Sequence, residues 1–479
     1  MASTTVDSGG PRGQERAAVL EQYTIEQIPL DQRHGKPRDL FTIWFTTNLM
    51  PLTIVTGAFT TALFGLNFWA SVVAIVLGNL IGAVFMALHS AQGPKLGIPQ
   101  MIQSRAQYGV LGSILVVGIV VFMYLGFFAS NLILGGQSIN QMTSAISVNW
   151  GIVVCAVLSL LVVIWGYDLI HFLNRWMAWL FSIVMIVATV YVLSDLPHGF
   201  LSKGSFSWGA FISAAVVTGV LWQIAYAPYV SDYSRYMPPE SATNKVFWNS
   251  YWGVVIGSTL PMLLGAVVGL ISTDTQIGAI STATKGFSVV VMLVFALGII
   301  DTNVLNAYGG MLCAITVGQN FRSHWFPGAR TRALFATVFV AITLWLALVY
   351  ASSFLTSFLN FMLFLLYLLV PWTLINLIDF YLVQHGEYDV AAMFRPDGGP
   401  YGKFNWGTIA IYLIGFAVEI PFINTTFYEG PAAKAVNGTD FSWLIAIVVV
   451  SPLYYWYAMR RRSKLRGVHT VTPEHASLD

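Results

Sequence analysis

Long apolar runs, separated by charged residues, proline or glycine, follow one another along almost the whole chain. A run of about 20 apolar residues crosses the hydrocarbon core of a bilayer as an α-helix, and the polar interruptions mark its ends. The pattern predicts an all-α integral membrane protein with twelve transmembrane helices, which we call spans 1 to 12. They cover residues 40–65, 69–91, 112–140, 150–167, 176–195, 209–231, 247–272, 287–317, 333–351, 355–383, 405–427 and 441–459.

The basic residues divide unevenly between the two sides that twelve spans define. With both tails in the cytoplasm, the outside connections contain only Lys203, Lys285 and Lys434 of the 23 Lys and Arg residues. This excess of cytoplasmic charge follows the positive-inside rule, and removing one span would destroy it. We therefore expect a multi-pass protein of the cell (plasma) membrane with both termini cytoplasmic. The basic run 460–466 then serves as a topology anchor.

The composition supports this assignment and excludes several classes of protein. Charged residues make up 9% of the chain, against roughly 25% in soluble domains, and the mean hydropathy is +0.70. The net charge of +2 is too small to suggest a nucleic-acid partner. Residues 1–39 lack the apolar core of a secretion signal, and Cys155 and Cys313 lie in apolar segments. A retained cytosolic tail and no disulfide framework are therefore expected.

Two spans carry polar residues and a proline where an ordinary membrane helix would be apolar. Span 1 contains Asn48 and Pro51, and span 6 contains Gln223 and Pro228. Interrupted helices at matching places in two halves of a chain are typical of transporters, in which the freed backbone lines a central cavity. The alternative is a proline kink in each of two ordinary packed helices.

The five-span separation of these interruptions predicts an inverted repeat with two helices added after it. We expect the cytoplasmic tails at 1–39 and 460–479, with the transmembrane transporter domain between them. Within that domain, repeat 1 covers about 40–195, repeat 2 about 209–383, and helices 11 and 12 about 405–459.

Span 8 holds the least ordinary polar cluster, from Asp301 to Tyr308. A carboxyl group halfway along an apolar run is costly in lipid, so Asp301 should face a cavity, a partner or an ion. Asn303 and Asn306 are three residues apart and share a helix face, as do Thr302 and Asn306 at four. For the asparagines, hydrogen bonds between helices without any ligand remain an alternative.

Span 3 contains aromatic residues beside small residues and an amide, notably Tyr124, Phe127 and Asn131. Such a face could form one wall of a flat pocket, with rings that stack on a planar ligand and an amide at its edge. Ordinary packing of the aromatic stripe is the alternative. Asp379 and Glu419, near the end of span 10 and in span 11, are interpreted as structural or gating residues.

Three sequence segments resemble the purine-cytosine permease group of the nucleobase:cation symporter-1 family. The segment 97–112, GIPQMIQSRAQYGVLG, resembles the family pattern SRAxFGxxG. The segment 231–238, SDYSRYMP, resembles DYxRYxP, and NVLNAY at 303–308 matches NxxNxY. The resemblance extends along nearly the whole chain, and the three segments occur in the family's order.

This resemblance implies a LeuT-type fold with a substrate site between spans 1, 3, 6 and 8. Alternating access would occur by rocking or gating around that site. The stacking aromatics of the family then correspond to Tyr124 and Phe127, with Asn131 one turn further on. The aromatic residue of span 6 corresponds to Trp222, or to Gln223 if the register is one residue off. Amides that read the ligand would be Asn303 and Asn306.

The resemblance leaves the coupling ion open, because this chain departs from the family pattern. Sodium-coupled members carry two successive hydroxyl residues on span 8, whereas this sequence has Asp301 followed by Thr302. Backbone carbonyls around Phe45 and Asn48 would supply the contribution of span 1. The carboxyl group of Asp301 could serve as a sodium ligand or carry a proton. The missing hydroxyl leads us to favour H+ over Na+.

The leading hypothesis is a cation-coupled symporter, active as a monomer, that imports a nucleobase or a related small nitrogen heterocycle. Candidate ligands include cytosine, purines, allantoin, hydantoins and vitamin-precursor pyrimidines. The alternative is a membrane receptor or transceptor for the same ligands. An enzyme is not expected, because Asp301 has no evident nucleophile or metal-ligand partner and the histidines are scattered. No cofactor is expected beyond the coupling cation, and no metal beyond a possible sodium ion.

Overall fold

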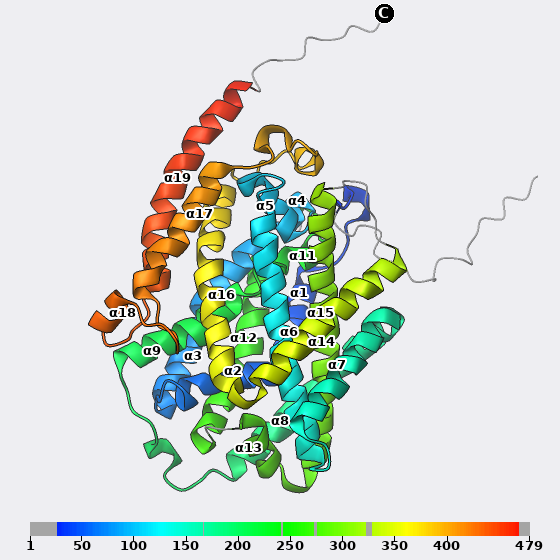
Figure 1. The fold of residues 1–479 in the computed structure, drawn as a ribbon, viewed down its shortest axis with the longest axis vertical. Helices are drawn as coiled ribbons and strands as arrows, with labels where there is room; N and C mark the ends of the chain where they lie inside the picture. The colour runs from blue at the N-terminus through cyan, green and yellow to red at the C-terminus, as the bar shows by residue number, and fades with distance from the viewer. Residues whose placement is uncertain (1–25, 166, 241–242, 273–274, 322–327, 469–479) are drawn as a thin grey trace, which may run out of the picture.

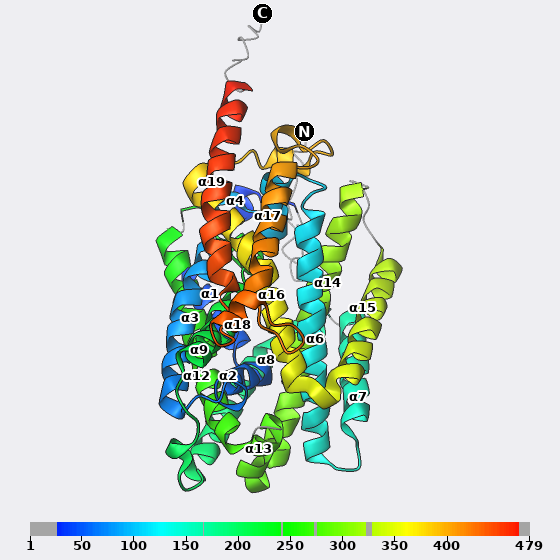
Figure 2. The same ribbon diagram turned by 60° about the vertical axis from the view of Figure 1, so that its left-hand side comes forward.

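The computed structural model describes residues 26–165, 167–240, 243–272, 275–321 and 328–468. Within these ranges the chain is helical, apart from the isolated bridges Leu66–Ser205 and Asn424–Glu429 and the connecting segments. Most of the long helices run along the long axis of the molecule, as the two views show (Figure 1 and Figure 2). Parts of both predicted tails, residues 1–25 and 469–479, lie outside the described residues.

The helices follow the predicted spans to within a few residues at most ends. In order, they are α1 with α2 (Pro37–Thr47 and Pro51–Ala62), α3 (Phe68–Ser90), α6 (Ile114–Met142), α7 (Val148–Trp165), α8 (Tyr167–Ser194), α9 (Trp208–Ala214), a π-helical segment (Ala215–Leu221), α10 (Trp222–Ile224), α12 (Thr243–Ile271), α14 (Ser288–Phe321), α15 (Ala329–Tyr350), α16 (Phe354–Leu377), α17 (Trp406–Glu419) and α19 (Ser442–Val468).

By length and composition, the described chain has six helical stretches that can cross a membrane, or seven if α1 and α2 form one span. Four further apolar helices are shorter, and the stretch from Arg330 to Val383 combines α15 and α16. The all-helical membrane class is therefore confirmed, whereas the number of twelve spans stays a prediction.

The break predicted in span 1 is confirmed. Helices α1 and α2 meet at an angle of 64°. Pro51 begins α2, and Met50 before it is extended, with φ −146° and ψ 158°. A proline excludes its preceding residue from the helical region, and its own fixed φ suits the first position of a new helix. The sequence Asn48-Leu-Met-Pro51 therefore ends one helix and starts the next.

Span 6 is also broken, as predicted. Its regular part α9 passes into the π-helical segment and the short helix α10, and the chain then turns before α11 (Val230–Ser234). Pro228 lies in this turn, where its missing N–H removes no helical hydrogen bond.

Close helix packing joins the two broken spans to α3 and α12. Helix α12 contacts α1, α2 and α3, and α3 contacts the π-helical segment of span 6. Glycines permit this approach, because a Cβ atom on Gly57 would overlap the backbone of Met262, and one on Gly219 would overlap the backbone of Gly78. On the other side of the molecule, α14 contacts α6, α7 and α8.

The motif segment 97–112 forms the short helix α5 (Gln100–Tyr108), which follows α4 (Gly93–Leu96) at the end of the molecule shown uppermost in Figure 1. We call this end the α5 end. The Arg105 guanidinium donates to the Asn320 side chain (2.6 Å) and to the Met393 carbonyl (3.1 Å). Burial lowers the pKa of Arg105 to about 10. The motif therefore ties the end of α14 to the loop before α17.

Other hydrogen bonds attach α5 to the ends of spans 6 and 10. The Gln100 backbone N–H donates to Asp232 Oδ1 (2.8 Å), and Gln107 Nε2 donates to Asp379 Oδ2 (2.9 Å). Asp379 also accepts from Tyr388 and Tyr454, which fits its predicted structural role.

The last part of the predicted N-terminal tail is packed against the same end. Arg33 is buried and donates to the carbonyls of Ile28 (3.1 Å) and Pro94 (2.6 Å). The Ile28 N–H donates to the Gly97 carbonyl (3.0 Å). Because these contacts replace water for several polar groups, residues 28–36 form part of the folded body and α1 begins at Pro37, before the predicted position 40.

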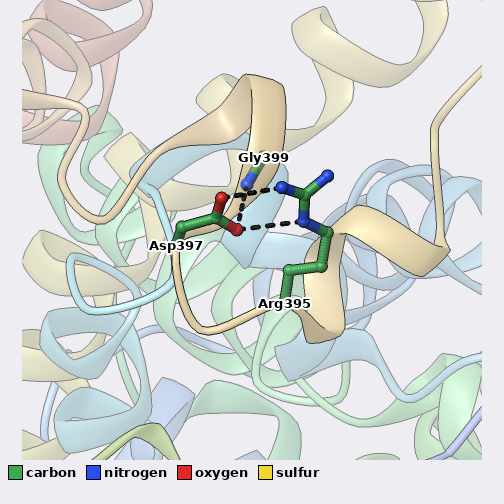
Figure 3. Close-up of polar contacts among 3 residues, drawn as sticks. All are labelled: Arg395, Asp397 and Gly399. Atoms are coloured by element: carbon green, nitrogen blue, oxygen red, sulfur yellow. Dashed lines mark hydrogen bonds and ion pairs between the residues drawn. The ribbon is translucent and has the colours of Figure 1, made fainter.

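The loop between spans 10 and 11 is more ordered than its glycines and prolines suggest. Asp397 accepts from Arg395 Nε (3.0 Å) and Nη2 (2.7 Å) and from the Gly399 N–H (3.1 Å) (Figure 3). Hydrogen bonding by Arg395 lowers the pKa of Asp397. Met393 and Tyr401 of this loop pack in a small apolar cluster with Ile102 of α5.

Span 11 is shorter than predicted. Helix α17 ends at Glu419 and passes into a 3-10 turn, Ile420–Phe422, instead of continuing to residue 427. Pro421 lies in this turn, and the chain then forms the Asn424–Glu429 bridge before α18 (Pro431–Ala435). The prediction continued the helix to residue 427 because apolar residues follow Pro421. In the structure the helix ends before this proline.

Substitution of Gly219 by alanine should destabilise the protein. Its new Cβ would overlap the backbone of Gly78 in α3, so α3 and span 6 would have to separate, at a cost of about 1–3 kcal/mol. Gly118→Ala in α6 is the matched control, because nothing lies within 4 Å of a Cβ there. Thermal unfolding in detergent should show a lower midpoint for Gly219→Ala only. Equal midpoints for the two variants would contradict the packing argument.

Candidate functional site

A cavity of about 1040 Å³ lies between the broken spans 1 and 6 and helices α6 and α14. On α6 its lining residues run from Val120 to Asn131, and on α14 from Thr302 to Thr316. These are the halves of both helices nearest the α5 end (Figure 1). His34 of the N-terminal segment and Asp39 of α1, both exposed, also line the cavity. The cavity therefore reaches from the middle of the helices to the surface at the α5 end.

Aromatic rings form much of the cavity wall. Phe127 of α6 and Trp222 of span 6 meet edge to face, with ring centroids 6.0 Å apart. Trp222 in turn contacts Tyr226 at 6.2 Å, and Tyr124 contacts Tyr229 at 5.7 Å. These rings present both faces and edges to the space between the helices, which suits a flat ligand.

Asn131 is a buried polar residue of this wall whose side chain is not satisfied by hydrogen bonds with the described residues. Its side chain lines the cavity and is 1% exposed, yet within the described part of the chain neither its amide oxygen nor its amide nitrogen has a hydrogen-bond partner. Buried amides are normally satisfied, and an unmet pair costs about 1–3 kcal/mol per group. One donor and one acceptor are therefore available to a ligand at this point.

Six of the eleven site residues predicted from the sequence line this one cavity. They are Tyr124, Phe127, Asn131, Trp222, Thr302 and Asn306. The structure brings them together from α6, span 6 and α14, although their functional roles stay predictions.

Gln223 lies away from the cavity, so of the two registers considered for span 6 the structure places Trp222 in the wall. The Gln223 amide donates to Asn79 Oδ1 of α3 (2.5 Å) and to Ser258 Oγ of α12 (2.8 Å). All three side chains are fully buried. They form a polar cluster that fixes span 6 to its neighbours.

Two of the predicted span 8 residues lie behind the cavity wall. Asn303 is fully buried and donates to the Phe128 carbonyl of α6 (3.3 Å), while its oxygen has no hydrogen-bond partner among the residues that the structure describes. Asp301 is 8% exposed, and its Oδ1 likewise has no partner among them. Thr302 between them faces the cavity and donates to the Gly298 carbonyl (2.9 Å).

The predicted span 1 residues pack against neighbouring helices. The Phe45 ring stacks on Phe41 at 6.0 Å, and the Phe45 backbone closely approaches Gly257 of α12. Asn48 is fully buried, and its amide oxygen accepts from Trp222 Nε1 (2.8 Å) and the Tyr226 hydroxyl (2.9 Å). The Asn48 backbone carbonyl accepts from the Met50 N–H (3.0 Å).

Sequence reasoning missed several aromatic residues of the cavity, namely Trp44, Tyr226 and Tyr229. Trp44 contacts Tyr226 at 5.6 Å. A signal was present, because Trp222 and Tyr226 are four residues apart within a stretch already expected to be broken. In the described part of the chain, no group of three or more His, Cys, Asp or Glu side chains is placed to hold a metal ion.

Comparison with known proteins places this helical, cavity-containing membrane protein among transporters. A family model described as permease for cytosine/purines, uracil, thiamine, allantoin matches residues 27–446. A putative purine-cytosine permease of Bacillus subtilis is 42% identical over 453 residues, which cover 94% of this chain and 98% of that protein. A purine-cytosine permease of Emericella nidulans is 25% identical, with 91% of this chain and 88% of the relative covered.

The chain belongs to this permease family, which is one of transporters and not of enzymes. The membership predicted from the three sequence segments is confirmed.

Solved structures show the fold. Mhp1, described as a nucleobase-cation-symport-1 family transporter, matches in its closed form with bromovinylhydantoin at a TM-score of 0.71 and 16% identity, over 93% of this chain and 96% of Mhp1. Its inward-facing form matches at 0.73 and 17% identity, over 96% and 100%. The predicted LeuT-type class is thereby confirmed.

The two cysteines should differ in their reaction with a small neutral thiol reagent. Cys313 lines the cavity, whereas Cys155 is fully buried and contacts Gly135 of α6. We expect one label per molecule, detected by mass spectrometry of the intact protein in detergent. Cys313→Ser should abolish labelling and Cys155→Ser should leave it unchanged. Labelling that persists in Cys313→Ser would place the open cavity elsewhere.

Proposed function

We propose that this protein is a cation-coupled symporter that imports a purine or cytosine-like nucleobase into the cell. The observation that carries the proposal is Asn131, a buried amide with a free donor and a free acceptor in an aromatic cavity. The names of the relatives, purine-cytosine permeases, agree with this ligand class.

The chemistry of a nucleobase complements this wall. Its ring is flat and can stack on or against Phe127 and Trp222, and its edge carries adjacent N–H donors and carbonyl or ring-nitrogen acceptors. An amide offers one acceptor and two donors, so Asn131 can form paired hydrogen bonds with such an edge. Asn306 lines the cavity from α14 and is our candidate for a second polar contact.

The proposal includes an orientation. We infer that the α5 end faces the cytoplasm, since the predicted cytoplasmic connections are found there, and that the protein lies in the plasma membrane with both termini inside. The cavity then corresponds to a state open to the cytoplasm, one of the two states that alternating access requires. The division into repeats at about 40–195 and 209–383, and activity as a monomer, remain part of this proposal.

We favour a proton as the coupling ion and Asp301 as the group that carries it. Its carboxyl group is buried, and no ion pair to it is found among the described residues; desolvation disfavours a charged carboxylate in such a place. The sodium alternative would use the Thr302 hydroxyl and the Asn48 carbonyl. Both take part in local hydrogen bonds, to Gly298 and from Met50, and each oxygen keeps a lone pair that could bind an ion, so the gradient experiment below decides between the two ions.

Substitution of Asn131 by alanine should weaken nucleobase binding. Loss of the paired hydrogen bonds in a dry site should cost about 1–3 kcal/mol, or roughly 5- to 150-fold in apparent affinity. Uptake of radiolabelled adenine and cytosine into proteoliposomes measures this. Asn140→Ala is the matched control, because Asn140 lies further along the same helix and bonds only the Ile146 carbonyl (2.8 Å). Unchanged affinity in Asn131→Ala would move the ligand site elsewhere.

Saturable binding without concentrative uptake in the wild-type protein would favour the receptor alternative.

Substitution of Asp301 by asparagine should abolish concentrative uptake while sparing exchange of internal for external ligand. Asparagine cannot take up and release a proton, but substrate movement without net coupling does not require it. Proteoliposomes with an imposed pH gradient, a sodium gradient or neither separate the two ions. Asp397→Asn, in the exposed loop, is the control and should accumulate ligand normally. Wild-type uptake that requires sodium and ignores the pH gradient would rule out the proton.

A further inference from the structure

The break in span 1 brings one side chain against the break in span 6. Asn48 follows the last residue of α1, and its amide oxygen accepts from both Trp222 Nε1 (2.8 Å) and the Tyr226 hydroxyl (2.9 Å). Its amide nitrogen donates to the Trp44 carbonyl of its own helix (2.7 Å). Every polar atom of the Asn48 side chain is thus engaged, with one end on span 1 and the other on span 6.

The direction of these hydrogen bonds is fixed by chemistry. An indole N–H can only donate, so the Asn48 atom facing Trp222 must be the oxygen. The nitrogen then faces the Trp44 carbonyl, which can only accept. Asn48, Trp222 and Tyr226 are 0%, 2% and 4% exposed, so water does not readily replace these bonds. A buried donor without a partner is strongly disfavoured.

Asn48 does not itself line the cavity, whereas both of its span 6 partners do. On the other side of span 6, the neighbouring Gln223 is held by Asn79 and Ser258. Trp222 therefore projects into the cavity from a segment that is fixed on both flanks. Its indole N–H, however, donates to a single acceptor atom, Asn48 Oδ1.

We propose that Asn48 is a positioning residue that sets the orientation of Trp222 and Tyr226 and thereby the size selectivity of the ligand cavity. The positioning follows from the hydrogen bonds alone. The selectivity rests on the function proposed above, because it assumes that nucleobases occupy this cavity. With the acceptor present, the two rings keep a fixed edge-to-face arrangement. Without it, the buried indole N–H lacks a partner and only packing contacts hold the ring, so its preferred orientation shifts and the space for a one-ring or a two-ring base changes.

A double-mutant cycle tests the transport consequence in proteoliposomes. Asn48→Ala should raise KM for the preferred base about tenfold, with a smaller change in kcat, and should change the adenine-to-cytosine ratio of KM by at least about threefold. Tyr226→Phe removes only one donor and should raise KM roughly threefold. If Asn48 and Tyr226 act through one hydrogen bond, KM of the double variant should be no higher than KM of Asn48→Ala alone.

Two further variants separate positioning from general loss of packing. Thr56→Val is the matched control, because Thr56 is fully buried one helix on and its hydroxyl donates only to the Leu52 carbonyl (2.8 Å). It should keep the wild-type KM and ratio. Asn48→Asp retains an acceptor oxygen and, with its buried carboxyl group protonated, an O–H that can replace the donor to the Trp44 carbonyl, and should restore the ratio to within about twofold of wild type. Two outcomes would overturn the proposed selectivity role. One is that the effects of the two single variants on KM multiply in the double variant, and the other is an unchanged adenine-to-cytosine ratio of KM in Asn48→Ala.

A ligand-free measurement tests the positioning itself. Indole N–H signals of ¹⁵N-labelled protein in nanodiscs report the 16 tryptophans, and Trp222→Phe identifies the Trp222 signal. We expect that signal to exchange slowly with water in the wild type and to shift and exchange faster in Asn48→Ala, but not in Thr56→Val. A Trp222 signal unaffected by Asn48→Ala would overturn the proposal. A clear effect in a protein that fails to transport nucleobases would retain the positioning and reject the proposed function instead.

Discussion

A bilayer leaves no water for unpaired backbone groups, and this constraint explains most of the structure. A membrane helix can be interrupted only where protein or a cavity covers the break. Both interruptions, after Asn48 in span 1 and around Pro228 in span 6, meet this condition, because they lie beside each other and beside the cavity. The position of the cavity is therefore a consequence of the two breaks. Amide side chains such as Asn131, which would be unsuitable on a lipid-facing surface, are gathered there with the aromatic rings.

The surroundings of the breaks are correspondingly rigid. Glycines such as Gly57 and Gly219 let α2, α3, α12 and span 6 approach to backbone contact, and buried amides connect them where backbone hydrogen bonds end. Helix α5 adds a second level of connection at its own end, through Arg105 and Gln107. An alternating-access transporter needs groups of helices that move as bodies, and segments joined by such close contacts are suited to form one of these groups.

The sequence alone predicted the fold well and the site in part. Apolar run lengths located the helices, and Pro51 and Pro228 located the breaks, because these signals are local. Tyr124, Phe127 and Asn131, which the sequence suggested as one wall of a pocket, all line the cavity from α6. It was harder to predict which residues of α14 face the cavity. Neighbouring residues on a helix point about 100° apart, and tertiary packing decides which of them faces it. Thr302 and Asn306 line it, while Asp301 and Asn303 lie behind it. The partners of Asn48 and Gln223 depend on a π-helical segment that no local pattern revealed.

The position of Asp301 behind the cavity wall is compatible with a role in coupling. A coupling group need not touch the ligand; it must differ in free energy between the two states that the ligand also distinguishes. Thr302 faces the cavity and Asn303 contacts the Phe128 backbone of α6, so the Asp301 segment is linked on one side to the cavity and on the other to a wall helix. Linkage is reciprocal: if protonation of Asp301 favours ligand binding by some factor, bound ligand must favour protonation by the same factor. An acid placed in the cavity itself would instead interact with the ligand directly, and its charge would select among ligands as well as couple them to the proton. Separation of the acid from the amides allows the two properties to be set independently.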